Sequence, residues 1–180
     1  MDGESVLSNM HLEEWSGDLT LYSSAYNPLP GRECPGFTFS EVEQVIAPGN
    51  RPRIEEQKKD SLHFTSCLLK KAPYVGKTRE RAEKYGWQPA GKQRSGVHVT
   101  DSTMIVLDID GASETQFAQI QKQLKSNGLS FIAYSSYSNG DPKKPGIRCR
   151  LVVPVDRALN KHEYKLAAAG LTQFLGLGHD

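Results

Sequence analysis

The sequence predicts an α+β fold: a ferredoxin- or RRM-like split βαβ sheet unit with helices on one face, preceded by a small αβ subunit. Strand and helix patterns follow the order β-α-β-β-α in the second half of the chain, and a shorter strand and helix precede them. With 37% hydrophobic and 24% charged residues, the composition is typical of a globular protein. We assign residues 1–100 to the αβ subunit and 101–180 to the RRM-like subunit, which we expect to stop before its closing strand.

Bulk properties narrow the class of protein only in part. The net charge of +1 excludes neither nucleic acid nor acidic partners, because a local basic surface matters more than the sum. The chain has no apolar run of membrane-span length and no signal-peptide pattern, so we expect a cytoplasmic protein without a membrane partner. Cys34, Cys67 and Cys149 lack metal-ligand spacing, so we expect free thiols.

The first subunit contains one strand pattern and one helix pattern. Leu19–Tyr22 reads as a short strand that a turn rich in proline and asparagine closes. Phe37–Ala47 reads as a helix, with Ser40 and Glu43 at the spacing of a capping box. Residues 62–69 are apolar, but their periodicity does not decide between strand and helix.

Basic side chains and aromatic rings are interleaved between residues 70 and 100. This mixture suits a surface that follows a phosphate backbone and stacks on bases, although an ordinary solvated loop has the same composition. We predict that the segment faces a nucleic-acid template. The candidate contacts are Trp87, Lys92, Arg94 and His98, of which we expect the last two to lie near the aspartates described next.

Two aspartates follow a short apolar strand in the middle of the chain. Met104–Leu107 reads as a strand buried on both faces, and it runs directly into Asp108, Ile109 and Asp110. Because side chains alternate along a strand, both carboxylates project from one face. Two carboxylates that lie so near to each other repel unless a cation lies between them, and Mg²⁺ or Mn²⁺ suits such ligands. The alternative is that these residues only form a turn and a cap.

The rest of the chain alternates between helices and strands. Capping-box residues begin both helices, and an Asn-Gly pair ends the first of them. The predicted elements are a helix from Ser113 and Gln116 to Asn127, strands at Leu129–Ser136 and Ile147–Val155, and a helix from Asn160 with Glu163 at its third position.

This order brings several polar groups to one end of the sheet. The helical crossover makes the first two strands parallel, and the hairpin makes the third antiparallel. The aspartates, the turn after the second strand and the arginines of the third strand then converge, as binding of a metal-bound triphosphate requires. Alternatively, the arginines simply pair with the aspartates. The candidate nucleotide contacts are Ser136, Ser138, Asn139, Arg148 and Arg150.

Three motifs carry a resemblance to a known family. They are D-I-D at residues 108–110, Y-S-S-Y-S-N at 134–139 and K-P-G-I-R-C-R-L-V-V-P-V-D-R at 144–157, with the lead-in from Arg94. Together they resemble the primase-polymerase domain of phage and plasmid replication proteins in the archaeo-eukaryotic primase superfamily. The resemblance covers about residues 90–180.

The resemblance implies a DNA primase or DNA-directed polymerase, a nucleotidyltransferase that acts in DNA replication. Asp108 and Asp110 match the family's metal ligands for Mg²⁺ or Mn²⁺, and Asp180 matches its late acid better than Asp156 does. The implied partners are a single-stranded DNA template, nucleoside triphosphates and a C-terminal helicase-like domain in a longer chain.

The turn after the second strand departs from the family pattern. The pattern ends in histidine, whereas Tyr137 and Asn139 occupy the corresponding positions here. An asparagine amide can donate a hydrogen bond to phosphate but cannot carry the charge of an imidazolium. A primase fold that binds nucleic acid without catalysis is therefore one alternative.

The sequence V-L-D-I-D-G also resembles the nucleophile motif of haloacid-dehalogenase-type phosphatases, in which the first aspartate attacks phosphate. That family requires a late lysine and a further acidic pair. The chain instead continues with the two-arginine strand pattern, so this alternative has the weaker support.

Overall fold

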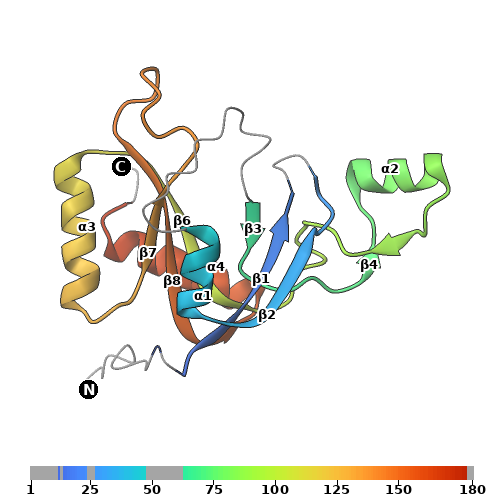
Figure 1. Cartoon of the computed structure of the whole chain (residues 1–180), viewed down its shortest axis with the longest axis horizontal. Helices are drawn as coiled ribbons and strands as arrows, with labels where there is room; N and C mark the ends of the chain where they lie inside the picture. Colours follow the sequence, from blue (N-terminus) through green and yellow to red (C-terminus); the bar gives the residue numbers. More distant parts are fainter. Residues whose placement is uncertain (1–11, 13, 24–26, 48–62, 178–180) are drawn as a thin grey trace.

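The computed structural model describes residues 12, 14–23, 27–47 and 63–177. Within them the fold is α+β, with four helices and three small antiparallel sheets. Figure 1 shows α3 and α2 at opposite ends of the molecule, with the N-terminal strands between them. No helix among the described residues combines the length and apolar character that a membrane span needs.

The N-terminal sheet has the strand order β2-β1-β3, in which β1 is Ser16–Tyr22, β2 is Arg32–Thr38 and β3 is His63–Thr65. The predicted strand at Leu19–Tyr22 is thus confirmed as part of β1. The sequence did not predict β2, because its residues R-E-C-P-G-F-T include proline and glycine and show no alternation. For residues 62–69, where the sequence does not decide between strand and helix, the structure forms the short strand β3 at His63–Thr65.

Helix α1 spans Phe39–Ile46 and begins two residues later than predicted. Its N-cap is Thr38, whose hydroxyl accepts a hydrogen bond from the amide of Glu41, while the Glu41 carboxylate accepts one from the amide of Thr38. This register buries Val42 and Ile46 against the N-terminal strands. The predicted cap at Ser40 and Glu43 is therefore wrong.

A small projection follows the N-terminal sheet and was not predicted as a separate element. Strands β4 (Ala72–Pro73) and β5 (Ala90–Gly91) pair with each other, and helix α2 (Gly76–Tyr85) lies between them in the chain. We call residues 72–91 the α2 arm. Figure 1 shows that α2 lies at the end of the molecule away from α3.

The C-terminal sheet has the strand order β6-β8-β7, with β6 at Ser102–Ala112, β7 at Ile132–Ser135 and β8 at Ile147–Leu159. Both outer strands run antiparallel to β8, so β6 and β7 are parallel, as predicted. Helix α3 (Glu114–Ser126) connects β6 to β7, and α4 (Lys161–Phe174) follows β8. The predicted order β-α-β-β-α is confirmed, and the likeness to the ferredoxin-like fold stays a prediction.

Both predicted caps of the C-terminal helices are confirmed. Ser113 and Gln116 exchange the two hydrogen bonds of a capping box at α3, and Asn160 and Glu163 do so at α4. Strand β8 extends to Leu159, beyond the predicted end at Val155, because Leu159 pairs with Ser102 of β6 after a shift in register.

The two faces of this sheet pack against different parts of the chain. On one face, residues such as Ile109 and Leu151 pack with Leu124 of α3 and with Leu175, just after α4. On the other face, Met104 and Val152 pack with the side chains of the N-terminal sheet and α1. That second face also carries the aspartates and arginines, since these alternate with the side chains of the first face.

Strand β6 lies at an edge of its sheet and, among the described residues, is paired along its length with β8 alone. The hydroxyl of Tyr164, on α4, lies 3.3 Å from the Val106 nitrogen and 3.4 Å from the Val106 carbonyl oxygen. One hydroxyl therefore accepts from the amide and donates to the carbonyl of the same residue. Because these groups point away from β8, Tyr164 covers the free side of β6 at this position.

Candidate functional site

Two aspartate–arginine pairs lie side by side on the C-terminal sheet. Asp108 is directly opposite Arg150, and Asp110 is directly opposite Arg148, in the β6–β8 register. Arg150 Nε donates to Asp108 Oδ1 at 2.7 Å, and Arg148 Nη1 donates to Asp110 Oδ1 at 2.6 Å. We call these four residues the Asp–Arg patch. The structure therefore brings the predicted acids and arginines together, and it pairs them as the alternative interpretation expects.

The carboxylates of the patch face solvent more than the guanidinium groups do. Each aspartate side chain is 63% exposed, against 20% for Arg148 and 30% for Arg150. Ion pairs with this degree of exposure typically contribute only about 0–1 kcal/mol, because water and salt screen them. Ligands that offer the carboxylates a cation and the arginines an anion can therefore replace these pairs at low cost.

Tyr134 on β7 is a neighbour of the patch that the sequence interpretation missed. It is directly opposite Arg150 in the β7–β8 register, and it packs against Phe64 of β3 with ring centroids 6.4 Å apart. Burial raises the pKa of Tyr134 above its usual value. For Arg150, burial acts to lower the pKa, but the hydrogen bonds to Asp108 and Tyr134 leave it raised. Tyr134 precedes Ser136 by two residues, so strand alternation could have placed it on this face.

The turn after β7 is attached to the backbone of Arg148. The amide of Ser136 donates to the Arg148 carbonyl at 2.9 Å, and the amide of Arg148 donates to Asn139 Oδ1 at 2.8 Å. The hydroxyls of Ser136 and Ser138 lie 3.5 Å apart. The structure thus brings the predicted polar turn to the edge of the Asp–Arg patch.

One donor of the patch is not used within the described residues. The Nε atom of Arg148 is buried and has no hydrogen-bond acceptor among them. A buried polar group without a partner costs free energy, more so when it belongs to a charged side chain. Because the atom is buried, a bound anion would remove this cost only if the guanidinium turned so that Nε faced it.

Two glycines let the acid-bearing and arginine-bearing strands approach closely. Gly146 has φ of +85°, and a Cβ placed there would lie 2.7 Å from the carbonyl carbon of Gly111. Gly111 directly follows Asp110, and Gly146 stands two residues before Arg148. A larger residue at Gly146 would push apart the two backbones that hold the Asp110–Arg148 ion pair.

The residues of the patch fit a magnesium-type ion only as a partial set of ligands. Mg²⁺ is commonly held by one or two carboxylates, with phosphate oxygens and waters completing its coordination. Within the described residues, no third acidic, histidine or cysteine side chain joins the two aspartates in a cluster. Asp180 lies outside the described residues. Asp156 is six positions along β8 from Arg150, which is roughly 20 Å of extended chain, so it does not reach the patch.

Lys92 and Arg94 contact the N-terminal sheet. Lys92 forms an ion pair with Glu33 of β2, and this hydrogen bond lowers the pKa of the Glu33 carboxyl. The Arg94 guanidinium lies 4.9 Å from the ring centroid of Tyr22, on β1. These contacts join the base of the α2 arm to the N-terminal sheet, and the predicted roles of both residues in nucleic-acid binding stay predictions.

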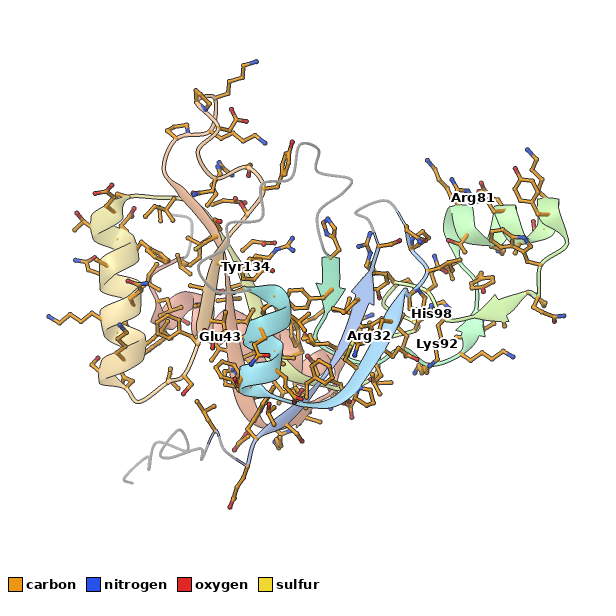
Figure 2. All side chains as sticks on the ribbon, in the orientation of Figure 1. Arg32, Glu43, Arg81, Lys92, His98 and Tyr134 are labelled. Carbon is orange, nitrogen blue, oxygen red and sulfur yellow. The ribbon has the colours of Figure 1, made fainter. Side chains whose placement is uncertain are left out.

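His98 is a buried residue, which contradicts its predicted contact with nucleic acid. Its side chain is fully inaccessible, its Nδ1 lies 2.7 Å from the Ser95 hydroxyl, and its Nε2 lies 3.2 Å from the Ala72 carbonyl oxygen. In Figure 2, His98 is well separated from Tyr134, so it is not near the Asp–Arg patch either. The ring joins the β4 end of the arm to the segment that precedes β6.

Trp87 is exposed on the α2 arm, in agreement with a role at the surface. It stacks on Tyr85, an exposed ring that the sequence interpretation did not single out as a site residue. The pattern Y-G-W, with a glycine that ends a helix between two aromatic residues, is the signal that could have identified the pair.

The three cysteines are free and buried, which confirms the expectation of free thiols. Burial, together with the charges of Asp108 and Asp110, raises the pKa of Cys149 to about 11. Its thiol is therefore protonated at neutral pH and belongs to the core behind the patch.

Comparison of the chain with protein-family models, curated proteins and solved structures finds no match.

Proposed function

We propose that the Asp–Arg patch binds a metal–nucleoside triphosphate complex and that the protein performs metal-dependent, template-directed nucleotidyl transfer in DNA replication. The observation that carries the proposal is the pairing of two exposed aspartates with two less exposed arginines beside the Ser136–Asn139 turn. The motifs that resemble primase-polymerase domains supply these same residues.

The charges of the patch match the two components of such a complex. The paired aspartates suit a divalent cation, and the paired arginines suit phosphate oxygens. A cation bound alone would leave the two arginines without partners, and a phosphate bound alone would leave the two aspartates without partners. When both bind together, each charge of the patch has a partner.

The protein contributes positioning and charge stabilisation to this reaction. Arg148 and Arg150 hold and neutralise the phosphates, and the hydroxyls of Ser136 and Ser138 add hydrogen bonds at the edge of the patch. Bound Mg²⁺ or Mn²⁺ would polarise the phosphate that a primer 3′-hydroxyl attacks. The proposed partners are a single-stranded DNA template and a helicase-like domain in a longer chain.

The complete pairing of the patch also favours a second candidate, a nucleic-acid-binding module that does not catalyse transfer. In that protein the arginines would remain ion-paired with Asp108 and Asp110, and Asn139 would stand in the histidine position without its catalytic role. The deciding experiment is nucleotide incorporation on a primed single-stranded template with Mg²⁺ or Mn²⁺. Template binding without incorporation, in the natural full-length protein, would favour the second candidate.

Replacing an arginine of the patch should change the affinities for phosphate and metal in opposite directions. Arg148→Ala and Arg150→Ala should each weaken triphosphate binding by about 1.5–3 kcal/mol, the range for hydrogen bonds to charged groups. Each should also raise the affinity for Mn²⁺ alone, because the opposite aspartate loses its competing partner. Separate calorimetric titrations with each ligand measure both changes.

Arg157→Ala is the matched control, because Arg157 lies near the other end of β8, where it pairs with Glu163 at 2.9 Å. This variant should leave both affinities unchanged. Equal losses for a mono- and a triphosphate, with no gain in Mn²⁺ affinity, would show that Arg148 and Arg150 serve only the fold.

A further inference from the structure

We propose that the end of the α2 arm binds single-stranded nucleic acid, with Tyr85 and Trp87 stacking on bases and the basic face of α2 contacting phosphates. We call these two rings the stacking platform. The inference deepens the proposed function and in that sense rests on it, because it states where the template strand is held. Its binding test does not require nucleotide transfer.

The two rings of the platform are stacked but open to solvent. Their centroids lie 6.0 Å apart with an angle of 29° between the planes, and the residues are 60% (Tyr85) and 45% (Trp87) exposed. The Lys84 ammonium lies 5.3 Å from the centroid of the Tyr85 ring. An exposed pair of this kind offers an aromatic surface beside a positive charge, which is the combination that stacks on bases and attracts phosphates.

Backbone geometry fixes the platform in place. Gly86 ends α2 in the left-handed conformation with φ of +65°, and the amide of Trp87 donates to the Ala82 carbonyl at 2.9 Å. The chain therefore turns back so that the two rings meet. At the other end of the helix, the buried side chain of Gln93 donates to the hydroxyl of Thr78 at 3.0 Å. A surface ordered before binding loses less entropy when a strand stacks on it.

The cations of α2 are not evenly distributed around the helix. Lys77, Arg81 and Lys84 are exposed and recur at intervals of four and three residues, so they share one face. Arg79 lies on another flank, where it pairs with Glu83 at 3.6 Å. The basic face leads along the helix toward the platform at its C-terminal end.

The combination of rings and cations favours nucleic acid over an acidic protein segment. Carboxylates would use the cations but would leave the aromatic rings without a matching group, whereas a single strand supplies bases and phosphates in alternation. In Figure 2, Arg81 lies near the outer end of the molecule, away from Tyr134, which is consistent with an open surface on α2.

Tryptophan fluorescence tests the stacking directly. Trp15 is 7% exposed, so quenching by an added oligonucleotide reports on Trp87. We expect oligothymidylate to quench the emission and an abasic oligodeoxyribonucleotide of the same length to bind roughly 5- to 150-fold more weakly, the equivalent of stacking one base. Equal affinity for both strands without quenching would overturn the inference, as would equally tight binding of an acidic polypeptide.

Variants separate the rings from the charges, with binding followed by the anisotropy of a labelled oligothymidylate. Trp87→Ala and Tyr85→Ala should each lower affinity at every salt concentration and leave the salt dependence unchanged. Arg81→Gln should reduce the log–log salt slope by about 0.7, the value for one phosphate contact on a single strand. Arg79→Gln removes the same charge from the same helix and should leave the slope unchanged, so equal effects of the two would overturn the inference.

The Asp108→Asn variant distinguishes failure of this inference from failure of the proposed function. Loss of transfer with unchanged quenching by oligothymidylate is the expected result, because the platform and the patch are separate. If the unmodified protein performs transfer and the Trp87→Ala and Tyr85→Ala variants keep both its transfer rate and its template affinity, the platform alone is overturned. Quenching without any transfer by the full-length protein would overturn only the nucleotidyl transfer.

Discussion

Asp108→Asn and Asp110→Asn should each reduce nucleotide transfer on a primed template by roughly 10²- to 10⁴-fold. Charge stabilisation by a metal ion at phosphate is worth several kcal/mol, and each 1.4 kcal/mol corresponds to about a tenfold change in rate. An asparagine keeps the size of the side chain but loses the charge that attracts the cation. Rates of primer extension under Mg²⁺ and Mn²⁺ measure the effect.

Asp156→Asn is the matched control for this prediction. Asp156 is also an exposed aspartate of the C-terminal sheet, but it lies toward the far end of β8 from the patch. The control should extend primers at the unmodified rate, and all three variants should unfold at similar denaturant concentrations. Extension by the Asp108 and Asp110 variants at the rate of the control would remove both aspartates from the proposed reaction.

Leu151→Ala should lower the free energy of unfolding by about 2–5 kcal/mol, the range for truncating a buried leucine. Leu151 is fully buried on the central strand β8, opposite Leu107 on one side and Ala133 on the other. A loss of this size is a large part of the roughly 5–15 kcal/mol that stabilises a typical protein. Urea denaturation followed by circular dichroism measures the change.

Leu166→Ala provides the comparison, because Leu166 on α4 is 61% exposed. The same truncation there should change stability by no more than about 0.5 kcal/mol. Comparable losses at both positions would mean that β8 does not form the centre of the core. Because Leu151 points to the face opposite Arg150, the folded fraction of Leu151→Ala should still bind triphosphate.

Local patterns predicted the C-terminal half of the fold well and the N-terminal half less well. The caps at Ser113 and Asn160 were predictable because each has one partner at the right spacing. Before α1 the chain offers two overlapping capping boxes, one starting at Thr38 and one at Ser40. Packing of the helix against the N-terminal sheet selects between them, and sequence spacing alone cannot reveal that choice.

The candidate site was predictable where it depends on strand alternation and connection. Those two rules brought Asp108, Asp110 and the two arginines to one face, but they could not decide how the charges pair. That pairing depends on the β6–β8 register, which places an arginine opposite each aspartate. His98 was misjudged because a histidine in a basic segment looks exposed until the surrounding chain is known to fold over it.

Tyr164 has a consequence for the behaviour of many copies of the protein in solution. An edge strand with unpaired amides and carbonyls invites a strand from another molecule, which is a route to aggregation. At Val106 the tyrosine hydroxyl occupies both groups on the free side of β6. Asp108 and Asp110, two and four residues further on, place exposed charged side chains on the same edge strand, and charged side chains disfavour its pairing with a strand of a second copy. The edge that carries the acids is thereby protected from self-association by one hydroxyl and two charges.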